Sequence, residues 1–154
     1  MKITASIVLA AAAVTVAASA SAQFAKPEDA VKYRQSVMYV MSQHFGRIGA
    51  MASGKAPYDA NAAVDSARIV AMMAKLPWPG FSAATEKVNL PNRAKPEVWS
   101  DMAKFKQTGE HLVTETGKLL AAAETSNLDN LKTAFAATGK TCKSCHDDFR
   151  KDQK

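Results

Sequence analysis

Cys142, Cys145 and His146 stand near the C-terminus in the pattern C-x-x-C-H, and the sequence contains no other cysteine. On a helix these positions fall at i, i+3 and i+4, so both thiols and the imidazole project from one face. The pattern is typical of covalent haem attachment, in which the thiols form thioethers to the porphyrin and the imidazole binds the iron. We therefore expect one haem c per chain, held through Cys142 and Cys145, with His146 as an axial iron ligand.

The N-terminus carries the features of a secretory signal peptide. Lys2 is followed by an apolar stretch at residues 3–18, and Ala20, Ser21 and Ala22 form a small-residue cleavage site. We predict cleavage after Ala22 and a periplasmic location, where covalent haem attachment is expected. A membrane anchor would need about twenty strongly apolar residues. No later segment meets that requirement, so we expect no membrane insertion.

Three other chemistries use the same residue types as the C-terminal motif. A zinc site would need a fourth ligand, and the remaining histidines, His44 and His111, lie on distant segments. A thioredoxin-like redox pair favours a βαβ context, whereas the flanking sequence has helical periodicity. A structural disulfide would leave His146 unexplained. Haem attachment is the interpretation that accounts for the cysteines, the histidine and the export signal together.

Composition and charge limit the other classes of function that the chain could have. The chain of 154 residues has a formal net charge of +6, and its basic residues are dispersed among acidic ones. We therefore expect no nucleic-acid binding. Residues 23–154 are numerous enough for one domain with a real core. A mild positive charge suits encounters with acidic partner proteins.

Apolar residues recur at helical spacing in four segments and give no convincing alternating strand. The first predicted helix begins near Pro27 and runs out at Gly46 and Gly49, and Asp59 and Asn127 are predicted N-caps of the second and fourth. The pattern predicts an all-α protein, an antiparallel four-helix bundle with covalently attached haem. The other predicted limits are Leu76 for the end of the second helix, Pro96 for the start of the third, and residues 77–95 for a long connection.

The first helix has a second apolar stripe formed by Tyr33, Val37 and Val40. A surface helix of a monomer does not need apolar residues over so much of its circumference. We therefore predict a homodimer that packs through this stripe.

Four segments of the chain carry a resemblance to a known family. They are residues 23–36, the Leu76-Pro-Trp-x-x-Phe81 loop, residues 95–101, and residues 142–150 with the haem motif. Together with export and a motif on the last helix of a bundle, they resemble the cytochrome c′ family over the whole segment that follows the signal peptide. The ordinary cytochrome c fold has the opposite order, with its haem motif near the N-terminus and a ligating methionine downstream.

The resemblance implies a homodimeric haem protein whose iron is bound by His146 on one side and usually by no protein group on the other. The residue that covers the open face in the family is an apolar side chain of the first helix, and the matching position is Met38. We expect Met38 to block this face without binding the iron. The alternative is that its sulfur binds iron, as in low-spin, methionine-ligated relatives.

The resemblance also implies roles for the residues around the haem. Arg34 and Gln35 match positions near the propionates, where a guanidinium suits a carboxylate, although an exposed Arg34 is an open alternative. Arg150 matches a basic residue near the proximal histidine, and its alternative is an arginine that complements the helix dipole. Core packing is the equal alternative for the expected distal lining residues, which are Met41, Trp78 and Phe81.

Two functional classes follow from the resemblance. As a gas-binding protein the chain would take NO, and also CO, at the open iron position, and as an electron carrier it would exchange electrons with redox partner proteins. A low-spin carrier ligated by Met38 and His146 is the alternative within the same family. We expect no enzymatic activity, because Met38, Met41 and Phe45 supply no acid or base for O–O cleavage.

Overall fold

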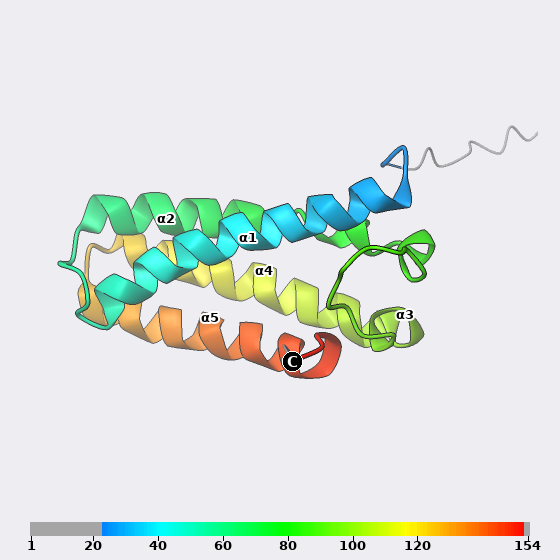
Figure 1. Cartoon of the computed structure of the whole chain (residues 1–154). Helices are drawn as coiled ribbons and strands as arrows, with labels where there is room; N and C mark the ends of the chain where they lie inside the picture. The colour runs from blue at the N-terminus through cyan, green and yellow to red at the C-terminus, as the bar shows by residue number, and fades with distance from the viewer. Residues whose placement is uncertain (1–22, 153–154) are drawn as a thin grey trace, which may run out of the picture.

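The structure is a computed structural model that describes residues 23–152, so the predicted signal peptide at residues 1–22 lies outside the described residues. Four long helices run antiparallel, each reversing the direction of the one before (Figure 1). No helix within residues 23–152 is long and apolar enough to cross a membrane. The predicted all-α four-helix bundle is confirmed. The long helices are α1 (Pro27–Ala52), α2 (Ala60–Met73), α4 (Met102–Glu124) and α5 (Leu128–Phe149).

Both predicted N-caps are present. The carboxylate of Asp59 accepts a hydrogen bond of 3.0 Å from the backbone N–H of Ala62, and Asn127 accepts bonds from two backbone N–H groups in the first turn of α5. These bonds satisfy amides that have no partner within the helix. The helix predicted to start near Pro96 is divided in two, because the backbone of Asp101 leaves the helical region at φ −126° and ψ 57°. A single turn, α3 (Glu97–Ser100), therefore precedes α4.

The predicted end of the first helix was wrong. α1 continues through Gly46 and Gly49 to Ala52, which buries Ile48 and Met51 against the rest of the bundle. Gly49 lies against the ring of Phe135 on α5, and a Cβ at this position would be 2.8 Å from the ring's Cζ atom. This glycine therefore serves the close approach of two helices rather than the end of one. α2 also ends earlier than predicted, at Met73 rather than Leu76.

The long connection between α2 and α4 is partly ordered into two short 3-10 helices, η1 (Trp78–Phe81) and η2 (Ala83–Thr85). Trp78 packs against both apolar clusters of the bundle. The smaller cluster contains Val98, Phe105 and Phe149 at the end of the bundle that carries the haem motif. The larger cluster extends to the other end and contains Met41, Ile48, Met51, Ala63, Ala67, Val70, Ala74, Leu112, Leu119, Ala123 and Leu131.

The three residues of the apolar stripe predicted for the dimer interface differ in how far they are exposed. Val37 is only 6% exposed within one protomer, so it is a core residue and its assignment to the interface was wrong. Tyr33 is half-buried, and its ring lies 5.1 Å from that of Phe24. Val40 alone of the three remains exposed.

The exposed large apolar side chains of the described residues are Tyr39 and Val40 on α1, Met72 on α2, and Leu76 just beyond α2. α1 and α2 run antiparallel from the connection at residues 53–59, so Val40 and Met72 lie at the same level of the bundle. We call these four residues the α1/α2 apolar surface.

Candidate haem site

The C-x-x-C-H motif lies in the last two turns of α5, with both cysteines half-buried and free of any disulfide. Burial raises the pKa of the Cys142 thiol, with a further contribution from Cys145, and burial also raises the pKa of Cys145. Redox-active cysteines require the opposite shift, because the thiolate is the nucleophile. The environment of the pair therefore favours apolar thiols facing the bundle interior over a thioredoxin-like redox pair.

His146 is in a different electrostatic environment. Partial burial lowers its pKa, and the positive charges of Arg150 and Arg93 lower it further. A lower pKa favours the neutral imidazole, which is the form that binds a metal. The local structure thus keeps His146 in the state that an axial iron ligand requires.

A cavity of about 510 Å³ opens at this end of the bundle, between the motif on α5, the first half of α1 and the connection that carries Trp78. Its volume falls in the range of about 300–1,000 Å³ that is usual for cofactor sites. The structure brings every site residue predicted from the sequence to this one cavity. These residues are Arg34, Gln35, Met38, Met41, Trp78, Phe81, Cys142, Cys145, His146 and Arg150.

Arg34 is the most unusual residue of the cavity. Its side chain is only 3% exposed, which excludes the exposed alternative, and burial lowers its pKa to about 10. One terminal nitrogen, Nη1, donates to the carbonyl oxygen of Gly80 at 2.6 Å and to the hydroxyl of Thr85 at 3.1 Å. The guanidinium also lies over the ring of Phe81, 4.3 Å from its centroid.

The other terminal nitrogen of Arg34, Nη2, is buried and has no hydrogen-bond partner. None of the ion pairs among residues 23–152 includes Arg34. Leaving a buried donor without an acceptor is costly, and a buried charge is costlier still. A carboxylate is the acceptor that best suits a guanidinium. An apolar cavity with a buried, unsatisfied guanidinium at its wall fits a haem, which has an apolar ring and two propionates.

Gln35, the other residue predicted near the propionates, lies on the exposed rim of the cavity. Its side-chain nitrogen donates a hydrogen bond of 2.9 Å to the carbonyl oxygen of Pro91. In this structure Gln35 therefore links α1 to the long connection. Its role toward a propionate stays a prediction.

Arg150 lies just beyond the last turn of α5, four residues after His146. It is the C-cap residue, with extended backbone, and forms an isolated antiparallel β-bridge with Ala94. Next to this bridge, Arg93 donates two side-chain hydrogen bonds, of 2.9 and 2.7 Å, to the carbonyl oxygen of Lys151. The bridge therefore fixes the connection to the end of α5, beside His146.

Sequence reasoning missed Arg93, Asn92 and Ala94 as lining residues, since an irregular connection has no periodicity that would place them. Thr138 and Thr141 were also missed, although they precede Cys142 and Cys145 by one helical turn and therefore share their face. The other lining residues not assigned to the site are Tyr39, Ser42, Phe45, Val70, Val98, Phe105, Leu112, Thr116 and Phe149.

Comparison with known proteins agrees with this arrangement. The family described as Cytochrome C' matches residues 29–150. Cytochrome c' from Alcaligenes xylosoxydans xylosoxydans is 46% identical over 129 residues, which cover 84% of this chain and 98% of that protein. The crystal structure of cytochrome c' from Rubrivivax gelatinosus is 43% identical, superimposes with a TM-score of 0.80, and is matched over 84% of this chain and all of that one.

A second solved structure is a nitric oxide complex of a variant of cytochrome c prime from Alcaligenes xylosoxidans. It is 44% identical, with a TM-score of 0.78, and the match covers 85% of this chain and 100% of that one. The sequence match, the fold and the cavity at the C-x-x-C-H motif lead to the same conclusion. This chain belongs to the cytochrome c′ family, whose members bind haem c covalently.

Proposed function

We propose that this protein is an exported haem c cytochrome that binds NO and CO on the haem face opposite His146, and that exchanges electrons with partner proteins. The observation that carries the proposal is the cavity that the motif on α5 shares with the apolar residues Met38 and Met41 of α1. A bound haem supplies a one-electron Fe(III)/Fe(II) couple and one iron position for an exogenous ligand.

The two sides of the cavity have different chemical characters. α5 supplies the thiols of Cys142 and Cys145 and the imidazole of His146. The stretch of α1 that carries Met38, Met41 and Phe45 supplies thioether and aromatic side chains, and the guanidinium of Arg34 lies nearer the start of the helix. Small uncharged gases suit an apolar pocket, because they have no charge to desolvate. A peroxidase would need an acid or base on the distal side to cleave an O–O bond. We therefore propose ligand binding and electron transfer rather than enzymatic turnover.

Met38 decides between gas binding at an open iron position and a low-spin electron carrier. It is half-buried and packs against the larger apolar cluster, so its thioether can occupy the distal space without binding the iron. In that arrangement a gas binds once the flexible side chain moves aside. The same flexibility also permits ligation of the iron by sulfur, which would make the protein a low-spin carrier ligated by Met38 and His146.

Location and assembly complete the proposal. The signal peptide predicted at residues 1–22 supports export to the periplasm. The α1/α2 apolar surface, which comprises Tyr39, Val40, Met72 and Leu76, supports a homodimer formed through these helices. The net positive charge supports redox partners with acidic surfaces.

Absorption and resonance-Raman spectra of the purified holoprotein test the proposal. We expect ferric and ferrous forms that are five-coordinate and high-spin. Met38→Ala should then bind CO faster and more tightly, because the side chain that must move is gone, while the signature of His146 ligation is unchanged. Gln43→Ala is the matched control, since Gln43 is an exposed residue of the same helix that neither lines the cavity nor belongs to the α1/α2 apolar surface.

A low-spin wild type that becomes high-spin in Met38→Ala would contradict gas binding as the primary role. It would establish the alternative, in which the sulfur of Met38 binds the iron and the protein is a dedicated electron carrier.

A further inference from the structure

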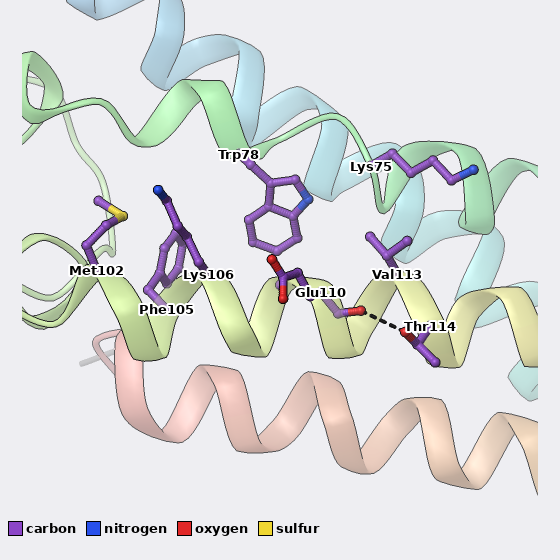
Figure 2. A pocket seen from close by; sticks show the side chains of 9 residues that line it. Lys75, Trp78, Met102, Phe105, Lys106, Glu110, Val113 and Thr114 are labelled. Carbon is purple, nitrogen blue, oxygen red and sulfur yellow. Dashed lines mark hydrogen bonds between the residues drawn. The ribbon is translucent and has the colours of Figure 1, made fainter.

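A second cavity, of about 550 Å³, lies on the outer side of α4, beside the start of η1. Figure 2 shows its residues in place: Trp78 projects from the connection toward α4, and the side chains of α4 surround it. We call this cavity the α4 groove. It is lined by Lys75, Trp78, Met102, Phe105, Lys106, Gly109, Glu110, Val113 and Thr114.

The lining of the α4 groove separates by polarity. Its charged residues, Lys75, Lys106 and Glu110, are exposed. The inner surface is formed by buried or half-buried apolar groups, with Met102 and Val113 on either side of the aromatic rings. An inner surface of this kind accepts small uncharged molecules without desolvating a charge.

Two aromatic side chains separate the α4 groove from the haem cavity, because Trp78 and Phe105 line both. Their rings meet edge to face with centroids 5.7 Å apart. These two side chains therefore form a wall that the groove and the haem cavity share.

The position of Trp78 is set by two contacts. Its indole N–H donates a hydrogen bond of 2.8 Å to the carbonyl oxygen of Ala74, and its six-membered ring rests on the backbone of Gly109. A Cβ at Gly109 would be 2.9 Å from Cζ3 of the indole, so any side chain at this position would displace the ring. The bare backbone of Gly109 thus allows Trp78 to close the wall between the two cavities.

We propose that the α4 groove is the entry site for diatomic gases and that Trp78 is the gate between the groove and the haem cavity. The proposal rests on the gas binding proposed above and adds a route to it. The other rim of the haem cavity, at Gln35 and Ser42 on α1, is exposed and polar, and Gln35 is tied there to the carbonyl oxygen of Pro91. The α4 groove offers an apolar path.

Filling the groove in the holoprotein tests the route. Val113→Trp should lower the association and dissociation rate constants of CO, measured by flash photolysis and ligand replacement, at least several-fold and by the same factor. The dissociation constant should stay unchanged, because the substitution obstructs the path and leaves the bound state alone. Lys106→Trp, at an exposed rim position, provides a second obstruction should Val113→Trp fold poorly, since Val113 packs against the core.

Gln107→Trp is the matched control, because it places the same ring at an exposed position of α4 that lines neither cavity. It should leave both rate constants close to those of the wild type. Crystals of the holoprotein under xenon pressure give a readout independent of the iron. Xenon should occupy the α4 groove of the wild type and be excluded by Val113→Trp.

Three results would contradict the proposed entry route, and each has a different cause. Unchanged CO rates in folded Val113→Trp and Lys106→Trp, or equal slowing by Gln107→Trp, would show that the gas does not enter through the α4 groove. A wild type that binds no CO would defeat the proposed gas binding and the route with it. A change in the dissociation constant with an unchanged association rate would show that Val113 affects the bound state and not the path.

Discussion

The two ends of the bundle are built from the same four helices but differ in how their interiors are filled. At the end where residues 53–59 and 125–127 connect the helices, Ile48, Leu119 and Leu131 are completely buried and fill the interior with aliphatic side chains. At the other end the helices enclose a cavity of about 510 Å³, with the buried guanidinium of Arg34 at its wall. We call these the closed end and the haem end.

The difference shows that the protein's own side chains complete only one of the two ends. Protein interiors are close-packed, and a cavity of this size forfeits many contacts among the groups that line it. Arg34 adds an unsatisfied buried donor to that cost. The protein's own side chains fill the closed end, whereas the haem end needs its cofactor to fill the space and to supply an acceptor.

Removing the covalent attachment of haem should have the largest effect on local stability, and the effect should be confined to the haem end. In Cys142→Ser combined with Cys145→Ser, we expect little stable holoprotein, because nothing retains the group that fills the cavity. Amide hydrogen exchange should then show fast exchange near Met38 and in the last turns of α5, with protection retained around Leu131. Uniform protection along all four helices would contradict the division into two ends.

A core truncation at the closed end gives the complementary result. Leu131→Ala should lower the free energy of unfolding by about 2–5 kcal/mol, the range for leucine truncation in a packed core. Haem content should remain that of the wild type, because Leu131 does not line the haem cavity. Guanidinium unfolding followed by circular dichroism and by Soret absorbance checks both statements. A loss of haem comparable to that of the double cysteine variant would show that the ends are not separable.

Arg34→Met tests whether the guanidinium serves the haem or the fold. In the holoprotein we expect the free energy of unfolding to fall by about 1–3 kcal/mol, because a buried propionate and the carbonyl of Gly80 would lose their donor. In the double cysteine variant, which lacks haem, the same substitution should be neutral or stabilising, since it removes a buried, uncompensated charge. Urea unfolding of the wild type, of Arg34→Met, of the double cysteine variant and of the three substitutions together measures the effect of Arg34→Met with and without haem. An equal loss with and without haem would assign Arg34 to the fold alone.

Changing Val40, which belongs to the α1/α2 apolar surface but does not line the haem cavity, should alter assembly and leave both ends of the bundle intact. Val40→Glu should shift the proposed homodimer toward monomer, because association would bury a charge at the two-fold axis. Light scattering at micromolar concentration measures the shift, with Ala136→Glu, at an exposed position on α5, as the matched control. Val37→Glu should instead destabilise the protomer, since Val37 is a core residue. A wild type that is monomeric at this concentration would contradict the proposed dimer.

The closed end was largely predictable from the sequence. Helical periodicity indicated its stripes, and the caps Asp59 and Asn127 were recognised from residue type and position. The ends of the helices were less predictable. Gly49 suggested a helix end because glycine is a poor helix former, but its actual role is to admit the ring of Phe135, a contact between residues far apart in the chain.

The haem end was predictable only where motif or family resemblance supplied the signal. Every residue assigned in that way lines the cavity, but the contribution of Arg93 depends on the bridge between Ala94 and Arg150 and has no local signature. The burial of Arg34 was equally hidden, since arginine is usually exposed. Its hydrogen-bond acceptors, Gly80 and Thr85, come from the irregular connection.

The central claim is that the haem end is completed by a covalently attached haem. Acid–acetone extraction of the purified protein, followed by the intact mass of the denatured chain, tests it most directly. We predict that the colour stays with the polypeptide and that the mass exceeds that of the chain by one haem, an increment lost in Cys142→Ser combined with Cys145→Ser. Haem that is extracted freely, with zinc co-purifying on the chain, would contradict the account.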